Sequence, residues 1–388
     1  MKISHKYSLG KFFTFELSKF QPVHGWFWYK EGFASELVQY CIDDFSKTRK
    51  SEPKIILDPF CGTGTTLLSA KAAGIRSIGI DASPLAVFIA QTKCDEYFER
   101  DLEAVEEFIT NKKTAPISTR WEFELFDPRA AFPKRNYNEI LALRAGIEEV
   151  ENPRARNLLL LALLSVLPQA SLILKDGGVL KIRKDRKAAP AKEIFTRKVK
   201  SMIRELRNRA INGPNQSAYL GDARALDIAN ETIDLVITSP PYLNNIDYSK
   251  IYGLELSLLS MSKSEAEIMR MLAIRSFIGR DMNVGSEAMP PEVGEIGEKI
   301  QIIGTYFKDM EAAIIEMYRV LRPGGVAYVN VSNSVIHETH VLVDEVFAEM
   351  AERIGFSEVE IIVGAERIAD IKPSKVKTRE SVIVMRKD

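Results

Sequence analysis

Cysteine is scarce in this chain of 388 residues, which has three, Cys41, Cys61 and Cys94. They are too few and too scattered for a disulfide framework or a zinc site, so we expect no metal centre and a reducing, intracellular setting. The first residues lack the apolar run of a signal peptide. The longest apolar stretch, residues 158–167, is too short to cross a bilayer. These absences predict a cytoplasmic protein without a membrane segment.

An excess of one charge is also absent, because 53 basic residues balance 53 acidic ones. The overall charge therefore indicates no partner. Hydrophobic residues, at 46%, suffice for a substantial core, and the length allows one large domain or two ordinary ones. Basic residues gather locally between positions 181 and 209, where only Asp185, Glu193 and Glu205 oppose them. Such a run is usually the solvated face of a helix, although it can also contact phosphates.

Apolar periodicity predicts alternating helices and strands near the start of the chain. Residues 35–47 have helical spacing, residues 55–57 form a short buried strand, and residues 65–73 form a helix. A second strand at 77–83 and a helical stretch at 84–110 follow. This β-α-β-α order implies a parallel sheet.

The alternation stops between residues 111 and 213, which contain proline-broken helical pieces and no convincing parallel strand. It resumes with strands at 217–223, 233–238, 326–331 and 380–385 and helices at 305–321 and about 340–354. Neither half has enough strands for a sheet of its own. We therefore predict a split catalytic domain, 1–110 and 214–388, interrupted by a basic, mostly helical insert at 111–213.

The nine residues 58–66, Asp-Pro-Phe-Cys-Gly-Thr-Gly-Thr-Thr, lie where the first strand meets the first helix. Ligands of open α/β sheets bind at this edge, and glycines there let the backbone approach a ligand closely. Asp81 ends the second strand, where an acidic residue can accept bonds from both ribose hydroxyls. A nucleotide triphosphatase is disfavoured because Gly-Lys-Ser/Thr is missing, and Leu67 departs from the dinucleotide pattern. The alternative is a tight turn followed by a chance acidic residue.

Ser239-Pro240-Pro241-Tyr242 directly follows the strand at 233–238. Two prolines restrict the backbone and remove two donors, which leaves their carbonyls as acceptors. The amino nitrogen of cytosine or adenine is conjugated with its ring, and acceptors aimed at its hydrogens favour a pyramidal nitrogen with an available lone pair. We assign this role to the Ser239 hydroxyl and the Pro240 carbonyl, and expect Tyr242 to stack on a base that has left the duplex. The alternative is a strand-ending turn, for which Pro-Pro is common.

Both motifs resemble those of the amino-methylating, N4-cytosine or N6-adenine, DNA methyltransferases. The resemblance implies a Rossmann-like α/β sheet with helices on both faces, and S-adenosylmethionine as cofactor. It further implies that the glycine loop surrounds the methionine part, that Asp81 holds the ribose and that Asp222 contacts the adenine. Residues 30–37 resemble the segment that closes over the methionine end, although an ordinary helix start would look the same. The implied catalytic residues are Ser239, Pro240, Pro241 and Tyr242, and the implied cofactor-binding residues are Lys30, Phe33, Ser35, Asp58, Pro59, Phe60, Gly62, Gly64, Thr65, Thr66, Asp81, Ala82, Asp222 and Ala223.

Within that family, serine at the first position of the tetrapeptide is typical of N4-cytosine enzymes, and Asp or Asn of N6-adenine enzymes. Methylation at cytosine carbon 5 is disfavoured because it needs a cysteine after a proline, whereas Cys61 follows Phe60 and the other two cysteines lie in predicted helices. The hypothesis is therefore a site-specific cytosine-N4 DNA methyltransferase of a restriction-modification or related system. The alternatives are N6-adenine methylation, RNA base methylation, and DNA binding without catalysis.

By resemblance, a target-recognition region lies between the two motifs. Here the insert precedes the strand before Gly221-Asp222-Ala223 rather than following it, which departs from that class. We expect double-stranded DNA and a cognate restriction endonuclease as partners in a prokaryotic cytoplasm, and neither membrane nor metal. Residues 262–304 are irregular and indicate no role. The candidate DNA contacts are Lys184, Arg186, Lys187, Arg197, Lys198, Lys200, Asn244 and Asn245, of which the asparagines could equally bond turn carbonyls.

Overall fold

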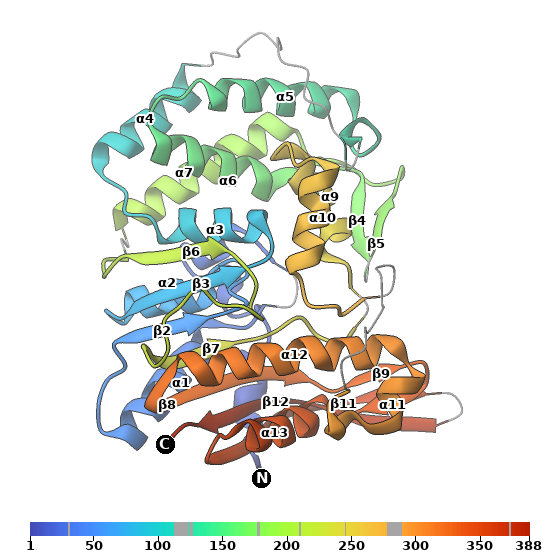
Figure 1. Ribbon diagram of the computed structural model, residues 1–388. Helices are drawn as coiled ribbons and strands as arrows, with labels where there is room; N and C mark the ends of the chain where they lie inside the picture. The colour runs from blue at the N-terminus through green and yellow to red at the C-terminus, as the bar shows by residue number, and fades with distance from the viewer. Residues whose placement is uncertain are drawn as a thin grey trace.

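The computed structural model describes residues 1–29, 32–111, 124, 127–176, 179–208, 211–244, 246–277, 289–371 and 374–388. An eight-stranded sheet in the order β1-β11-β12-β8-β7-β2-β3-β6 forms its centre (Figure 1). Every strand of this sheet except β12 runs in the same direction. The strands are β1 (Lys2–His5), β2 (Ile55–Asp58), β3 (Arg76–Asp81), β6 (Gln216–Leu220), β7 (Ile233–Thr238), β8 (Leu321–Ser332), β11 (Glu358–Ile371) and β12 (Ser374–Arg386). The predicted α/β fold class is thus confirmed, and the sheet takes strands from both halves of the chain.

Helices cover both faces of the sheet. The central strand β7 is buried along its whole length, as expected for a parallel strand with helices on both sides. On one face, Ile56 and Leu235 share an apolar cluster with α1 (Ser35–Arg49). On the other face, Leu57 and Val236 cluster with α12 (Gln301–Val320) and α13 (Val343–Ile354).

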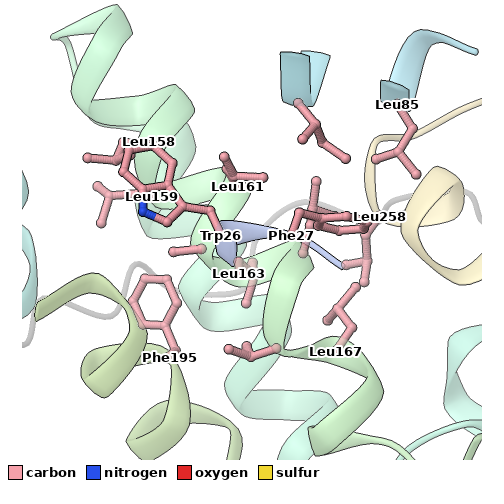
Figure 2. Close-up of a cluster of buried hydrophobic side chains, with 14 of the residues drawn as sticks. Trp26, Phe27, Leu85, Leu158, Leu159, Leu161, Leu163, Leu167, Phe195 and Leu258 are labelled. Carbon is pink, nitrogen blue, oxygen red and sulfur yellow. The ribbon is translucent and has the colours of Figure 1, made fainter. Parts of the chain in front are cut away.

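The helices of the insert add a layer at the β6 end of the sheet (Figure 1). The helices α5 (Lys134–Glu148), α6 (Pro153–Ala170) and α7 (Ala191–Asn208) lie with α4 (Glu99–Thr110) over α3 (Pro84–Cys94). Figure 2 shows their leucines, Leu158 among them, around Trp26 and Phe27 and next to Phe195 and Leu85. The insert and the catalytic half therefore share one apolar core.

Helix α7 also holds the N-terminal segment in place. Glu205 Oε2 accepts hydrogen bonds from the Val23 backbone N–H at 3.0 Å and from Trp26 Nε1 at 2.8 Å. Lys198 Nζ donates to the Gly25 carbonyl at 3.2 Å. One face of this basic helix is thus part of the fold, because it fixes the segment that leads to Trp28 and Tyr29.

Several elements differ from the sequence prediction. Strands β1 and β11 were not expected, nor was the hairpin of β4 (Ile173–Asp176) and β5 (Val179–Ile182). The helical stretch 84–110 is two helices, since α3 ends at Cys94 and Asp101 caps a new start at Phe98. The remaining elements are α2 (Thr65–Ala72), α8 (Tyr248–Ile251), α9 (Gly253–Leu258), α10 (Lys263–Leu272), α11 (Gly294–Lys299), β9 (Ser334–Ile336), β10 (Thr339–Val341) and 3-10 turns at Tyr7–Phe12, Ser18–Phe20, His24–Trp26, Pro128–Ala130 and Pro291–Val293. In the described ranges, no helix is long and apolar enough to span a membrane.

Candidate functional site

A cavity lies at the carboxyl ends of the parallel strands, between the loops that follow β2 and β7. These strands are neighbours in the sheet, so their ends meet. Residues of both sequence motifs border the cavity, together with residues of α8 and the end of α10. Its lining consists of Tyr29, Gly32, Phe33, Pro59, Phe60, Cys61, Gly62, Thr63, Thr65, Asp81, Ala82, Ser83, Gly221, Ala223, Ser239, Pro240, Pro241, Tyr248, Met269, Leu272, Ala273 and Ile274.

The glycine loop has a backbone conformation that would be strained for other residues. Gly62 and Gly64 have φ values of +49° and +81°, in the left-handed region. A Cβ on Gly64 would also lie 2.9 Å from that of Ala90, whereas Gly62 faces the cavity. The loop therefore brings the Gly62 backbone to the cavity, whereas Gly64 packs against α3, and contact of these glycines with a cofactor stays a prediction.

Asp81 joins this loop to the end of β3. Its Oδ2 accepts from the Gly62 N–H at 2.9 Å and its Oδ1 from the Ser83 N–H at 2.8 Å. Burial raises the pKa of Asp81 to about 6, against the opposing effect of these two bonds. Each carboxylate oxygen has more than one lone pair, so both can still accept from a ligand hydroxyl. The position suits a ribose, and the binding of ribose by Asp81 stays a prediction.

Asp58 lies beneath the cavity and does not line it. Its Oδ1 accepts from Thr238 Oγ1 at 2.6 Å and from the Phe60 N–H at 3.1 Å, and its Oδ2 accepts from Thr66 Oγ1 at 2.6 Å. Burial raises the pKa of Asp58 to about 6, while the bonds from Thr238 and Thr66 oppose that rise. Asp58 and Thr66 therefore brace the ends of β2 and β7 from inside, and any contact of theirs with the cofactor stays a prediction.

Asp222 is already paired. Arg224 donates from Nε to Asp222 Oδ1 at 2.9 Å and from Nη2 to Oδ2 at 2.8 Å, while the neighbours Gly221 and Ala223 line the cavity. Arg224 also donates to the Met271 carbonyl at 2.6 Å. This arginine thus ties the predicted adenine-binding strand end to the last turn of α10, which borders the cavity.

The tetrapeptide divides between two cavities. Ser239, Pro240 and Pro241 line the first one. The Pro241 carbonyl accepts from the buried Tyr306 hydroxyl at 3.1 Å. Among the described residues, the Ser239 hydroxyl and the Pro240 carbonyl have no hydrogen-bond partner.

Tyr242 lies in a second cavity, beside the first. This cavity shares Tyr29 and Gly32 with the first one, so the two adjoin. Aromatic and charged side chains mix in its wall. The lining consists of Phe13, Thr14, Phe15, Glu16, Trp28, Tyr29, Gly32, Tyr242, Ser332, Arg367 and Glu380.

Three stacked tyrosines form a wall that sequence reasoning missed. The rings of Tyr29 and Tyr252 are nearly parallel, with centroids 4.6 Å apart, and Tyr248 stacks beside both. Burial, and next the charge of Asp81, raise the pKa of Tyr29. The signal available in the sequence was the i, i+4 spacing of Tyr248 and Tyr252, although Tyr252 lies just after α8 in the structure. Nothing in the sequence pointed to Tyr29 as their partner.

Other predicted cofactor residues lie as follows. Phe33, Pro59, Phe60, Thr65 and Ala82 line the first cavity. The Ser35 hydroxyl instead donates to Gln21 Oε1 at 2.7 Å and does not line it. Lys30 and Asn245 lie outside the described residues. Asn244 borders a third hollow, which Tyr242 also lines.

The basic residues that were predicted to contact DNA do not share one free surface. The Arg186 guanidinium donates to the carbonyls of Pro168 and Ile173. Arg197 forms an ion pair with Glu193 at 2.8 Å, and Lys198 bonds Gly25 as described above. Of these bonds, only that of Lys198 joins α7 to another segment, since Arg186 precedes α7 and the exposed Arg197–Glu193 pair lies within the helix.

The carboxyl end of α7 lies away from the cavities, and Lys200, in the middle of this helix, borders a separate hollow with Glu106 and Arg207. In Figure 1 the arrowheads of β3 and β6 point toward the hairpin β4–β5, whereas the carboxyl end of α7 lies at the opposite side. Lys184 and Lys187 follow the hairpin, are exposed, and have no ion-pair partner among the described residues. The hairpin contacts α8, and its Lys175 pairs with Glu255 of α9 at 2.7 Å. These two lysines are therefore on the side of the cavities.

Within the described ranges, no group of three or more His, Cys, Asp or Glu is placed to hold a metal ion. The first cavity instead offers a carboxylate at Asp81, backbone at Gly62 and an apolar wall at Leu272, Ile274 and Ala223. This combination fits a nucleoside with a polar tail.

A family model and several known proteins are similar to this chain. A family model for N6/N4 DNA methylases matches residues 6–92 and 233–388, together more than half of the chain. The Type II methyltransferase M.BsoBI of Geobacillus stearothermophilus is 28% identical over 97% of this chain and 88% of its own length. The Type II methyltransferase M.AvaI of Nostoc sp. is 27% identical over 91% and 83%. A solved structure of a TehB-like SAM-dependent methyltransferase from Corynebacterium glutamicum is 11% identical, covers 92% of this chain and 90% of that one, and has a TM-score of 0.31.

Proposed function

Because the chain belongs to the DNA methylase family, we propose that it methylates the N4 amino group of a cytosine flipped out of double-stranded DNA. DNA methyltransferase activity and S-adenosylmethionine as cofactor come with the family. The observation that carries the finer proposal is the tetrapeptide. The Ser239 hydroxyl and the Pro240 carbonyl border the cofactor cavity, and neither has a partner in the described ranges.

In this proposal, Asp81 accepts from the ribose hydroxyls and the loop around Gly62 surrounds the methionine part. Ala223, Leu272 and Ile274 give the adenine an apolar surface. S-adenosylmethionine supplies, when bound, an electrophilic methyl group on a sulfonium that leaves readily.

The protein's own part in the chemistry is orientation. Ser239 and Pro240 accept the two amino hydrogens of the base, which directs the nitrogen lone pair toward the cofactor cavity. Holding the reacting atoms in line replaces a rare encounter with a fixed geometry, and that can supply several kcal/mol of the barrier. The same acceptors hold the extra proton of the methylated amino group until solvent removes it.

The flipped base enters the second cavity. This cavity adjoins the cofactor cavity at Tyr29 and Gly32, so a base there can present its amino group to Ser239. Trp28 and Tyr242 offer ring faces on which a base can stack. Lys184 and Lys187 contact the phosphates, because they are exposed and unpaired on this side of the molecule.

The names of the relatives, Type II methyltransferases, extend the proposal to a biological setting. We infer that the chain modifies a specific site and protects it from a cognate restriction endonuclease. Serine at position 239 is what favours cytosine over adenine, by resemblance to the N4 enzymes.

The test is methylation in a host that lacks DNA methyltransferases. Its DNA is digested to nucleosides and analysed by mass spectrometry, and modified positions are sequenced. We expect N4-methylcytosine in one sequence context. N6-methyladenine alone would refute the cytosine assignment, and labelled methyl transfer to RNA but not to DNA would refute the DNA substrate.

A further inference from the structure

The hydroxyl of Tyr242 is held from two sides. It donates to Glu380 Oε1 at 3.1 Å and accepts from Asn330 Nδ2 at 3.0 Å. A ring that only needed to stack on a base would need no polar anchor at its far end. The two bonds fix where that end lies and so restrict the swing of the ring about its Cα–Cβ bond.

Both anchors come from the interior of the central sheet. Asn330 lies on β8 and Glu380 on β12, two adjacent antiparallel strands in which Val382 pairs with Asn330. Both residues are buried, at 2% and 6% exposure. The position of Tyr242, which lies on a loop, is therefore transmitted from the centre of the sheet.

Burying the carboxylate of Glu380 lowers the stability of the fold unless its interactions compensate for the lost hydration. A buried carboxylate loses its hydration, and its ion pair rarely repays that loss in full. It pairs with Arg367, where Nη2 lies 3.2 Å from Oε2 and the arginine side chain is 66% exposed. Apolar side chains at this position of β12 would support the sheet equally well. The carboxylate of Glu380 lines the second cavity together with Tyr242, whose hydroxyl donates to it.

We propose that Glu380, with Asn330, is a positioning residue for methyl transfer. It holds the Tyr242 ring as a fixed wall of the second cavity, so that a base stacked there has its amino group at Ser239 and Pro240. This inference rests on the function proposed above. It assigns to Glu380 no contact with the reacting atoms.

The direct test uses Tyr242→Phe, Glu380→Ala, Glu380→Gln and the double variant Tyr242→Phe/Glu380→Ala. Labelled methyl transfer to amplified, unmethylated bacterial DNA gives kcat and KM, and calorimetry gives the Kd for S-adenosylmethionine. We expect Tyr242→Phe and Glu380→Ala each to lower kcat about tenfold or more, which is the worth of one hydrogen bond to a charged group. The Kd for the cofactor should stay unchanged. Glu380→Gln retains an acceptor for the hydroxyl and should recover most of the rate.

The double variant separates positioning from a general structural role. Without the hydroxyl, Glu380 has nothing to hold, so Glu380→Ala should add no further loss in the Tyr242→Phe background. Losses that multiply would overturn the inference, as would full activity of Tyr242→Phe, a variant that changes one atom. Glu366→Ala, which removes a surface partner of Lys377 on β11, is the matched control and should behave as the parent chain.

Failure of the proposed function would look different. If the parent chain methylates adenine, or RNA, the cytosine or DNA assignment is wrong. The coupling between Tyr242 and Glu380 can still be measured with whichever substrate is methylated.

Discussion

Cofactor binding should depend on pH through Asp81. Its carboxylate accepts from Gly62 and Ser83, and burial raises its pKa to about 6. The ionised form is the better acceptor for ribose hydroxyls, so binding improves as pH rises through 6. At pH 5 only about a tenth of the free protein has this group ionised, and at pH 7 nearly all of it does. The Kd for S-adenosylmethionine should therefore fall about tenfold between pH 5 and pH 7.

The assay is isothermal titration calorimetry of the parent chain and of Asp81→Ala at both pH values. Removing two hydrogen bonds to a charged acceptor should weaken binding about a hundredfold at pH 7. The variant should also lose the difference between pH 5 and pH 7. The midpoint of thermal unfolding shows whether Asp81→Ala is still folded without the bonds from Gly62 and Ser83.

Two results would refute this reasoning. A Kd that is flat from pH 5 to pH 7 would mean that the ionised Asp81 does not bind the cofactor. A pH dependence that persists in Asp81→Ala would belong to Asp58, the neighbouring buried carboxylate whose pKa is also about 6.

Three further predictions concern the chemistry, the fold and the substrate. Ser239→Ala should lower kcat at least tenfold in the methyl-transfer assay and leave the Kd for the cofactor unchanged; unchanged kcat would contradict its assigned role. Asp58→Asn should raise the free energy of unfolding at pH 7 by up to about 3 kcal/mol in urea titrations. The pKa of Asp58 is raised from 3.8 to about 6 in the folded protein, so its protonated form stabilises the parent chain fully below pH 4, and this stabilisation is lost as the pH rises through 6. A variant less stable than the parent at pH 7 would contradict the prediction. Replacing Lys184 and Lys187 by alanine should weaken DNA binding and reduce the salt dependence of log K by about two, whereas Lys200→Ala, on the far side, should not; equal effects would place DNA elsewhere.

The local sequence was sufficient to predict those parts of the site whose positions follow from the order of strands and turns. A buried strand, a glycine turn and a helix occur together at residues 55–73, and parallel strands bring their carboxyl ends to one edge. For this reason Gly62, Asp81 and Ser239 could be expected around one cavity, and the structure has all three there.

The directions of the side chains in these motifs depend on partners from distant parts of the chain. Asp58 and Gly62 belong to one loop, yet Asp58 faces inward because Thr238 of the neighbouring strand offers it a hydroxyl. Tyr242 follows Pro241 directly, yet it lies in another cavity because Asn330 and Glu380 hold its hydroxyl. These partners are far away in sequence, so no local pattern indicates them.

The sequence by itself determined the fold class, the family and the two motifs, because strand periodicity, glycine loops and a Pro-Pro tetrapeptide are local properties of the chain. Only the tertiary structure decided which acceptors stay unpaired, which basic residues are taken up by the fold, and where Tyr242 is anchored. Lys198 shows the physical reason: its charge is evident in the sequence, but its bond to the Gly25 carbonyl exists only because α7 packs against the N-terminal segment.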